Sequence, residues 1–517
     1  MTKEITILWA DDEMDLLRPH ILFLQSKGYK VITSTNGDDT LKKAGENDID
    51  LVFLDENMPG KSGLEVLLPL KQLLPGIPVI MITKSEEEDI MDEAIGSKID
   101  DYLIKPVNPN QVLLTIKKHI DIRRLITKKT TSSYQSEFNS IGQQINNART
   151  SSDWIEIYKK IVYWELELEN SGQEISEVIK MQKNEANNEF SKFIKLNYAS
   201  WMKPDNVNKP LISPAIIGQR IFPLLEQGNK IMFFIIDNLR YDQWQIILPS
   251  ITEFCKVDKE ELYFSILPTS TQYARNALFA GLMPLEIQQL YPNLWISDED
   301  EEPKNINEEE LLKIQMNRLG KGFKYSYNKI NNEKSAKKLS DNFSNLIAND
   351  LNVVIFNFVD ILSHARTETD VVKELAIDEA AYRSITLSWF QHSSLLDILK
   401  ECARNNIKII ISTDHGTIRV TNPIKVLGDK RTSSNLRYKL GRNLNYNPKE
   451  VYEVRKPSEI HLPGINLTST YIFAHNIDFF VYPNNYNQFV NYYKNTFQHG
   501  GISMEEMMIP LAVLSAK

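Results

Sequence analysis

The stretch IKIIISTDHGTIRV, residues 407–420, is the part of the chain that most strongly indicates its fold. Its first half is a run of β-branched apolar residues, which is typical of a strand buried within a sheet. The run ends in Thr413-Asp414-His415-Gly416, so a carboxylate and an imidazole follow the strand directly. Ligand sites in α/β sheets lie at the carboxyl ends of the strands. The stretch therefore predicts an α/β domain with a metal site at this strand end.

Two more apolar stretches of the same region end in an aspartate. They are KIMFFIID, residues 230–237, and LNVVIFNFVD, residues 351–360. We therefore expect Asp237 and Asp360 to end strands of the same sheet as Asp414, with their carboxylates at one edge.

Three histidines accompany these aspartates. His415 follows Asp414 directly, His364 follows Asp360 at i+4, and His499 lies in the motif QHGGISMEEMMIP. If DILSHA begins a helix, the residues at i and i+4 face one point from its first turn. Mixed aspartate and histidine ligands suit Zn²⁺ better than Mg²⁺. Six ligands are more than one tetrahedral zinc needs, so the pattern predicts two zinc ions sharing a site.

A hydroxyl group is the expected partner of such a site. The segment LPTSTQYARNALFAG, residues 267–281, places Thr269, Ser270 and Thr271 after a proline, at the start of a predicted helix. A zinc ion can deprotonate an alcohol there, and the helix N-terminus favours the resulting anion and a phosphate target. From the residues alone, each of the three is a candidate nucleophile.

The N-terminal region, residues 1–125, alternates short apolar strands with amphipathic helices, which predicts a parallel sheet covered on both faces. The strands are ITILWA, YKVITS, LVFLD, PVIMIT and DDYLIK. At or just after their carboxyl ends lie Asp11, Asp12, Asp55, Thr83 and Lys105. Three carboxylates in one crevice repel each other unless a hard cation lies between them, and oxygen ligands suit Mg²⁺. A carboxylate beside that cation can accept a phosphoryl group, because the metal and the lysine neutralise the developing charge.

With DENMPGKSG after the third strand, this set resembles the receiver domain of response regulators. The resemblance implies that Asp55 is the phosphoacceptor and that Tyr102 is an aromatic switch residue acting with Thr83. It also implies a Mg²⁺ site made by Asp11, Asp12, Asp55 and the backbone carbonyl of Asn57. Phosphorylation is then expected to draw Thr83 and Tyr102 inward and to remodel the face formed by the fourth and fifth strands and the helix between them. Because that face is a frequent dimer contact of receivers, we expect a homodimer on phosphorylation.

Bulk properties limit the class of protein. A chain of 517 residues is too long for one core, and 42% hydrophobic with 25% charged residues is typical of a soluble globular protein. Two cysteines favour a reducing compartment. We expect a cytoplasmic protein without a membrane span, since the sequence shows neither a signal-peptide core nor a long apolar run. The net charge of −9 argues against a strongly basic DNA-binding domain.

The segment between the two α/β regions has a helical and polar pattern. Its tryptophans and tyrosines fit a buried helix face, and a basic recognition helix is not evident. We interpret residues 126–225 as a helical coupling domain, with TKKTTSS (127–133) and KPDNVNKP (203–210) as connections. The acidic run SDEDEEPKNINEEE, residues 297–310, is interpreted as a solvated loop.

The C-terminal region resembles the alkaline-phosphatase superfamily, in particular its PglZ branch. The motifs PTST (268–271), DILSH (360–364), DHG (414–416) and HGGISMEEMMIP (499–510) occur in family order, and Gly281 closes the nucleophile helix. The resemblance implies that Thr271 is the nucleophile and forms a phosphothreonine. It implies one zinc held by Asp237, Thr271, Asp414 and His415, and a second held by Asp360, His364 and His499. A threonine at this position leans toward phosphodiesters.

A basic segment follows the metal strand. GDKRTSSNLRYKLGRN, residues 428–443, carries five cations, which are Lys430, Arg431, Arg437, Lys439 and Arg442. It is either a solvated loop or a binding surface for a substrate with several phosphates, such as an oligonucleotide.

Over its whole length the chain resembles the PorX family of Bacteroidota regulators. The fold class expected is a multidomain α/β protein: a doubly wound, flavodoxin-like receiver (1–125), a central helical bundle (126–225) and an alkaline-phosphatase-like α/β domain (226–517). The resemblance implies a sensor histidine kinase as phosphodonor, control of type IX secretion, and hydrolysis of short linear oligonucleotides or cyclic nucleotides. An alternative is a non-catalytic regulator whose metal site recognises a nucleotide, a sigma factor or a secretion-system component.

Overall fold

The computed structural model describes residues 5–74, 77–84, 99–107, 109–116, 119, 122–169, 173–203, 205–206, 208–297, 300, 302–368, 376, 378–428, 432–464 and 468–517. The chain divides into two compact units, residues 1–133 and residues 134–517. Each unit is described below by itself.

The described residues of the first unit form a five-stranded sheet of order β2-β1-β3-β4-β5, with every pair parallel. Its strands are β1 (Thr6–Ala10), β2 (Lys30–Ser34), β3 (Leu51–Asp55), β4 (Val79–Thr83) and β5 (Asp101–Ile104). Its helices are α1 (Arg18–Ser26), α2 (Gly37–Glu46), α3 (Gly63–Leu73) and α5 (Pro109–Ile116). The predicted helix between the fourth and fifth strands falls mainly at residues 85–98, outside the described residues.

Both faces of this sheet are covered, as a doubly wound fold requires. Along β1, Ile7 and Trp9 belong to a buried cluster that also contains residues of α1 and α5. Leu8 and Ala10 point the other way, into a cluster with residues of α2 and α3. The strand is therefore apolar throughout because alternate side chains fill two different cores. The predicted receiver-like fold is confirmed.

Three long helices connect the two α/β sheets in sequence. They are α6 (Ile122–Asn147), α7 (Ser151–Glu167) and α8 (Gln173–Trp201). The prediction that residues 127–133 form a connection is wrong, because they lie within α6. A capping box starts α7, where Thr150 and Asp153 each bond the other's backbone N–H. From Tyr134 onward these helices share one hydrophobic core with the C-terminal sheet, and Phe190 of α8 stacks on Phe264.

The large sheet of the second unit has the order β7-β18-β10-β6-β9-β8. Its strands are β6 (Ile231–Ile236), β7 (Cys255–Phe264), β8 (Tyr325–Ile330), β9 (Leu351–Phe356), β10 (Lys408–Ser412) and β18 (Met508–Ala516). The neighbours β10, β6, β9 and β8 pair in parallel, whereas β18 is antiparallel to both β10 and β7. The sheet is therefore mixed, because the C-terminal strand enters it in the opposite direction.

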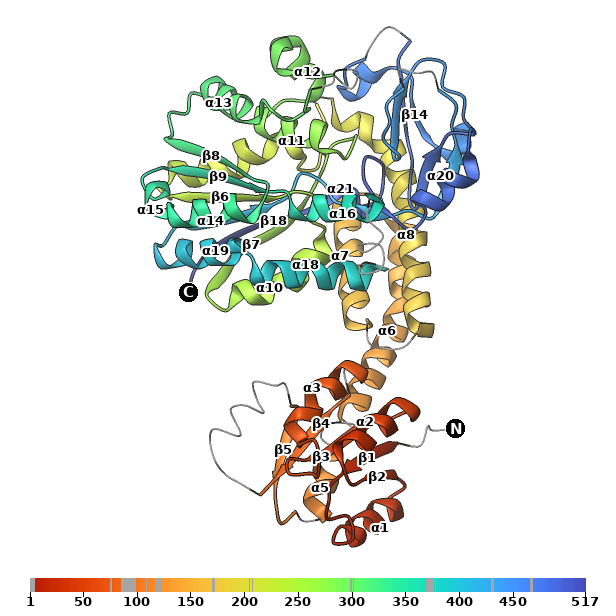
Figure 1. Ribbon diagram of the computed structural model, residues 1–517. Coiled ribbons are helices and arrows are strands. Elements are labelled where there is room, and N and C mark those ends of the chain that lie inside the picture. Colours follow the sequence, from red (N-terminus) through yellow and green to blue (C-terminus); the bar gives the residue numbers. More distant parts are fainter. Residues whose placement is uncertain are drawn as a thin grey trace. The chain divides into compact units, whose positions relative to one another are not determined.

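Helices cover both faces of this sheet. Figure 1 shows α10, α18 and α19 on one face and α11 and α13 on the other. The described helices after α8 are α9 (Phe222–Glu226), α10 (Tyr241–Thr252), α11 (Thr271–Ala280), α12 (Pro284–Leu290), α13 (Glu308–Arg318), α14 (Glu333–Asp341), α15 (Phe343–Leu346), α16 (Phe358–Glu368), α18 (Glu379–His392), α19 (Ser394–Arg404), α20 (Tyr486–Tyr493) and α21 (Met504–Met507).

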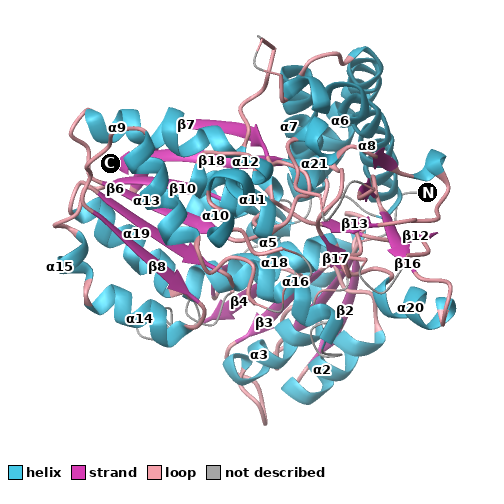
Figure 2. Ribbon diagram, turned by 90° about the horizontal axis from the view of Figure 1, so that it is seen from above, coloured by secondary structure: helices cyan, strands magenta, loops and turns pink. Residues whose placement is uncertain are grey.

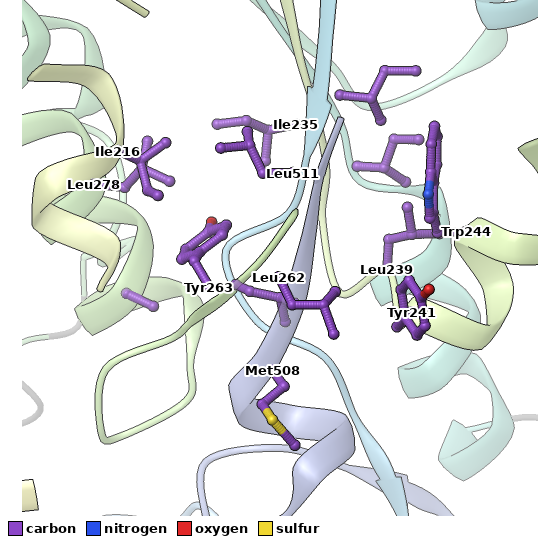
Figure 3. Close-up of a cluster of buried hydrophobic side chains, with 14 of the residues drawn as sticks. Ile216, Ile235, Leu239, Tyr241, Trp244, Leu262, Tyr263, Leu278, Met508 and Leu511 are labelled. Carbon is purple, nitrogen blue, oxygen red and sulfur yellow. The ribbon is translucent and has the colours of Figure 1, made fainter. Parts of the chain in front are cut away.

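The core of the second unit lies on both sides of the sheet. In Figure 3, Ile235 of β6, Tyr263 of β7 and Leu511 of β18 lie toward Leu278 of α11. Trp244 of α10 lies on the opposite side, where it is fully buried. Burial of apolar side chains on both faces is the main stabilising contribution to such a three-layer arrangement.

Small sheets form a separate β-rich part of this unit, drawn in blue in Figure 1 and set apart from the large sheet in Figure 2. Its strands are β11 (Ile418–Arg419), β12 (Asn422–Lys425), β13 (Tyr438–Gly441), β14 (Tyr452–Val454), β15 (Thr470–Phe473), β16 (Asp478–Val481) and β17 (Phe497–Gln498). None of the described helices is long and apolar enough to cross a membrane.

Candidate active site

The predicted zinc ligands lie in loops or in the first two turns of a helix. Asp237 directly follows β6, Asp414 lies two residues after β10, and His499 follows β17. The prediction that Asp360 ends a strand is wrong, because β9 stops at Phe356 and Asp360 lies in the first turn of α16. The helix begins early enough that Asp360 and His364 still lie one turn apart on one face.

One group of possible ligands contains Asp360, His364 and His499. Each of the three residues offers an atom within 4.8 Å of the atoms offered by the other two. The Oδ1 atom of Asp360 lies 3.5 Å from His364 Nε2 and 3.7 Å from His499 Nε2. Asn238 also reaches this carboxylate, since its Nδ2 lies 3.3 Å from Asp360 Oδ1.

A second group contains Asp237, Asp414 and His415, and all three are buried. His415 Nε2 lies 3.9 Å from Asp237 Oδ1 and 3.7 Å from Asp414 Oδ2. The two groups adjoin, because the His415 ring stacks on the His499 ring with centroids 4.3 Å apart. The structure therefore brings the six predicted ligand residues together in two adjacent sets of three.

Backbone carbonyls orient both buried imidazoles. His499 Nδ1 lies 3.1 Å from the carbonyl oxygen of Thr269, and His415 Nδ1 lies 3.1 Å from that of Gly416. In each ring this contact favours a proton on Nδ1 and leaves Nε2 as the atom directed at the carboxylates. Burial lowers the pKa of His415, and burial with the neighbouring His415 lowers the pKa of His499 to about 3. Both rings are therefore neutral, as metal-ligating imidazoles are.

The protein does not fully neutralise the two carboxylates of the second group. Burial raises the pKa of Asp237 and of Asp414, although Arg275 opposes the shift at both residues. Asp414 Oδ2 is buried and accepts no hydrogen bond from the described residues. An orphaned buried carboxylate oxygen beside two neutral imidazoles fits a divalent cation, and mixed Asp and His donors are the ligands that zinc takes. The residues present therefore fit the predicted metals.

The hydroxyl groups of the nucleophile segment have different surroundings. Thr271 Oγ1 lies 3.1 Å from His415 Nε2 and 3.5 Å from Asp237 Oδ1. Thr269 Oγ1 is occupied, since it donates to the carbonyl of Gly501 and accepts from the N–H of Gly500. Among the three side-chain hydroxyl groups in the described part of the chain, that of Thr271 is the one that contacts the possible metal ligands.

Thr271 is also the first residue of α11, which runs to Ala280. Its N–H and the next ones belong to the first turn, where backbone donors face outward and favour an anion. The helix ends at Gly281 with φ 60°, a left-handed conformation in which glycine carries no Cβ penalty. The predicted glycine stop of this helix is confirmed.

Sequence reasoning missed two charged residues beneath the site. Arg275 lies at i+4 from Thr271, is fully buried, and donates from Nη1 to Asp237 Oδ2 at 2.9 Å. Its Nε donates to Glu308 Oε1 at 2.7 Å. The prediction that residues 297–310 form a solvated loop is wrong at its end, where Glu308 is 1% exposed and begins α13. The i+4 spacing within the nucleophile helix was the available signal for Arg275.

Two loops of the site approach each other closely at Gly416. A Cβ atom at this position would lie 2.1 Å from the carbonyl oxygen of Glu505, so the residue has no room for a side chain. Glu505 follows the loop that carries His499. The glycine of the DHG motif therefore permits the contact between the two ligand-bearing loops.

The cations of the basic segment that the structure describes do not form a common surface. Arg437 is fully buried and pairs with Glu506 at 2.6 Å, and Lys439 is 2% exposed with Nζ donating to the carbonyl of Ser433. Burial lowers the pKa of Lys439 to about 8. Arg442 is exposed, whereas Lys430 and Arg431 lie outside the described residues. The prediction of substrate contact is not supported for Arg437 and Lys439, because burial keeps their side chains from the surface.

The first unit has its own carboxylate cluster. Ligand atoms of Asp11, Asp12 and Asp55 lie within 4.8 Å of one another, and the cluster fits Mg²⁺. Lys105 Nζ lies 2.9 Å from Asp11 Oδ2 and 3.1 Å from Asp55 Oδ1. Burial and the neighbouring Asp11 raise the pKa of Asp55 to about 6, against the effect of Lys105.

The other residues of the predicted receiver set are Thr83, Tyr102 and Asn57. Thr83 ends β4, and its Oγ1 donates to Glu56 Oε2 at 2.5 Å. Tyr102 of β5 is 40% exposed. Asn57, the predicted source of a carbonyl ligand, lies exposed in the loop after β3.

Comparisons with known families match three parts of the chain. The family described as "BREX system PglZ alkaline phosphatase-like domain" matches residues 216–514, which is more than half of the chain. The "PorX response regulator linker domain" matches residues 124–202, and the "Response regulator receiver domain" matches residues 7–117.

Curated relatives match between a fifth and a quarter of the chain. Transcriptional regulatory protein ResD of Bacillus subtilis is 34% identical over 116 residues, which cover 22% of this chain and 48% of that protein. The alkaline phosphatase synthesis transcriptional regulatory protein PhoP of Bacillus subtilis is 35% identical over 119 residues, or 23% of this chain and 48% of that protein. The chain thus spans about half the length of these two relatives. Among solved structures, a response regulator receiver domain protein from Clostridium thermocellum is 30% identical, covering 24% of this chain and 98% of that one, with a TM-score of 0.22.

Proposed function

Because the chain belongs to the PglZ alkaline phosphatase-like family and joins that domain to a receiver and a PorX-type linker, we propose that it is a phosphorylation-controlled zinc phosphodiesterase. It is a response regulator with a PglZ output domain, and that domain suggests a phosphoryl hydrolase. The observation that carries the catalytic proposal is the position of Thr271 Oγ1, 3.1 Å from His415 Nε2 at the start of α11.

Zinc ions held by the two ligand groups would polarise the phosphoryl oxygens and stabilise the departing alkoxide. Thr271 Oγ attacks phosphorus, so that its bond to phosphorus forms while the ester bond to the leaving alcohol breaks. The hydroxyl proton of Thr271 passes to the leaving alkoxide, which departs as the alcohol. Water then cleaves the phosphothreonine, restoring the hydroxyl and releasing the other product. The first N–H groups of α11 face the charge that develops on the nonbridging oxygens.

The surrounding residues position this chemistry. Thr269 is held between Gly500 and Gly501, and its carbonyl orients His499. The nucleophile segment and the HGG loop are thereby tied together, which keeps Thr271 and the ligand groups in one arrangement.

The regulatory part of the proposal rests on the receiver. A receiver domain implies a histidine kinase as phosphodonor, and we assign phosphorylation to Asp55. Oligonucleotide-type phosphodiesters or cyclic nucleotides as substrates, a role in type IX secretion, a cytoplasmic location and a homodimer of the phosphorylated form are further parts of this proposal.

Hydrolysis of bis(p-nitrophenyl) phosphate by the zinc-loaded protein tests the catalytic proposal. Thr271→Ala should keep its zinc, with at most a lower affinity at the second group, because the two aspartates and His415 remain. Its kcat should nevertheless fall by at least about a hundredfold, because the attacking hydroxyl is missing. Thr271→Ser should retain measurable turnover, because it keeps the hydroxyl.

Ser270→Ala is the matched control, since it removes a neighbouring hydroxyl that is 6% exposed and has no hydrogen-bond partner among the described residues. It should hydrolyse the diester at nearly the parental rate. Undiminished turnover by Thr271→Ala would assign the attack to another group. A parent protein that binds zinc without turnover would instead favour the non-catalytic regulator.

A further inference from the structure

A cavity lies at the opposite end of the nucleophile helix from Thr271. Its volume is about 530 Å³, and Gly281, where α11 ends, lines it. The helix has 10 residues and therefore spans about 15 Å, so the cavity and the candidate metal site are separate. A cavity of this volume is in the range that small-molecule sites occupy.

Much of the cavity wall is apolar. Ile212 and Met283 are buried in it, and Leu319, which follows α13, is 44% exposed. Gly218 contributes part of the wall from a π-helix, Ile217–Ile221. Such wide helical turns are rare and frequently occur at functional sites. The wall therefore offers contact to the apolar body of a ligand.

The charged groups of the cavity favour an anion. Lys209 and Arg318 both line it, and Arg318 Nη2 donates to two backbone carbonyls at the end of α11, at 2.8 and 2.9 Å, which do not neutralise the guanidinium. The described lining contains one carboxylate, Glu286, which accepts a backbone N–H at the start of α12 and attracts the ammonium group of Lys209. His461 Nδ1 lies 3.9 Å from the same carboxylate. The two cations thus outnumber the single carboxylate.

A buried amide completes the lining. Gln315 is 1% exposed, and its Oε1 accepts no hydrogen bond from the described residues. Its Nε2 would lie 2.2 Å from a Cβ atom at Gly281, so the side chain packs directly against the end of α11. A buried acceptor without a donor costs free energy unless a water or a ligand supplies the missing hydrogen bond.

From these features we propose that the cavity is a binding site for a small organic anion with an apolar body. The acid group of the ligand pairs with Lys209 and Arg318, its apolar part packs on the wall, and a hydroxyl or amine group on it donates to Gln315. The inference does not rest on the proposed phosphodiesterase function, because none of the described lining residues is a predicted zinc ligand or Thr271.

Calorimetry of the metal-free full chain tests the site with three probes. Hexane-1-sulfonate carries an anionic head and an apolar body, methanesulfonate carries the head with one methyl group, and hexan-1-ol carries the body without the charge. The parent should bind hexane-1-sulfonate at least about tenfold more tightly than either of the others, because each buried methylene group adds to the affinity. No detectable binding of hexane-1-sulfonate, or equal affinity for hexane-1-sulfonate and methanesulfonate, would overturn the proposal.

Lys209→Met tests the anion contact. It should weaken hexane-1-sulfonate about fivefold, which is the scale of one exposed ion pair, and leave hexan-1-ol unchanged. Lys203→Met is the matched control, because Lys203 is an exposed lysine six residues earlier that is not among the described lining residues. Equal effects of the two substitutions would refute a role of Lys209 in binding the anion.

Gly218→Leu tests the location. A Cβ atom at this position would lie 3.7 Å from Leu319 Cδ1 and 3.9 Å from Gln315 Nε2, which are ordinary contact distances, so the new side chain fits and fills part of the cavity. It should weaken hexane-1-sulfonate at least about tenfold. Gly142→Leu in α6 is the control, since apart from its own helix no described atom lies within 4 Å of that Cβ. Parental affinity in Gly218→Leu would place the binding elsewhere and contradict the proposal. These measurements need no turnover, so a failure of the proposed function does not affect their outcome.

Discussion

At the scale of single residues, Arg275 determines how the second ligand group is presented. Its Nη1 holds Asp237 Oδ2 at 2.9 Å, so the other oxygen, Oδ1, faces Thr271 and His415. Asp414 Oδ2 lies 3.8 Å from Arg275 Nε, and Glu308 anchors the guanidinium from behind. Loss of a partner that fixes the orientation of a metal ligand typically lowers metal affinity by about 10- to 100-fold.

We therefore predict that Arg275→Lys weakens zinc binding by about 10- to 100-fold, because a single ammonium cannot hold Asp237 and Glu308 in the same fork geometry. Competition with a chromogenic chelator measures the dissociation constant. Arg220→Lys is the control, since Arg220 pairs with Glu261 at 2.6 Å and both side chains are partly exposed. Parental affinity in Arg275→Lys would show that the guanidinium does not position the ligand.

At the scale of elements, α8 is built into the output domain. Lys183 Nζ lies 3.0 Å from Glu505 and 3.0 Å from Glu165 of α7. Asn187 donates to Glu505 and accepts from the N–H of Met504. These buried polar contacts tie the linker helices to the element that follows the His499 loop. Removing one partner leaves other charges buried and unpaired, which is more costly than losing a surface ion pair.

Lys183→Met is accordingly expected to lower the free energy of unfolding by about 3–5 kcal/mol, measured by urea denaturation of the metal-free protein. The matched control is Lys180→Met on the same helix. Lys180 pairs with Glu177 at 3.2 Å, and both side chains are more than half exposed. Its replacement should cost less than about 1 kcal/mol. Similar losses in the two variants would mean that α8 contributes no more than a surface contact.

At the scale of the whole molecule, the receiver and the output domain are separate compact units. Asp55 lies buried beside Lys105 in the first unit, and Thr83 is bonded to Glu56. A phosphoryl group on Asp55 would offer new acceptor oxygens to Thr83 and Lys105. The proposed regulation requires this change in the contacts of Thr83 and Lys105 as its signal. It does not require a direct contact between the phosphoryl group and the zinc ligands.

Acetyl phosphate with Mg²⁺ should therefore label the parent protein and increase its dimeric fraction in sedimentation, whereas Asp55→Ala should show neither change. Asp38→Ala is the control, because Asp38 belongs to the same unit and forms an exposed pair with Lys61 at 2.7 Å. It should label and dimerise as the parent does. Normal labelling of Asp55→Ala would place the phosphoryl group elsewhere.

Much of the fold and of the candidate site could be predicted from local patterns. Apolar runs of strand length, most of them followed by a charged residue, indicated two α/β regions, because a strand buried on both faces has few polar positions before its end. The six residues of the two ligand groups were recognisable in the same way, since motif spacing survives in the linear sequence. From the residues alone the nucleophile stayed open among three hydroxyls, and the resemblance to the PglZ branch favoured Thr271. Thr269 proved to be occupied by the HGG loop, and Thr271 to face His415.

The sequence by itself determined which residue types stand at strand ends and helix starts, since strand and helix periodicity and glycine stops are local properties. Only the tertiary structure decided which of these residues meet. It placed the C-terminal strand β18 antiparallel beside β10, moved Asp360 into the first turn of α16, and buried Arg437 against Glu506. It also paired Glu308, from an apparently solvated acidic run, with Arg275. The physical reason is that a buried charge requires a partner, and partners distant in the chain leave no periodic pattern in the sequence.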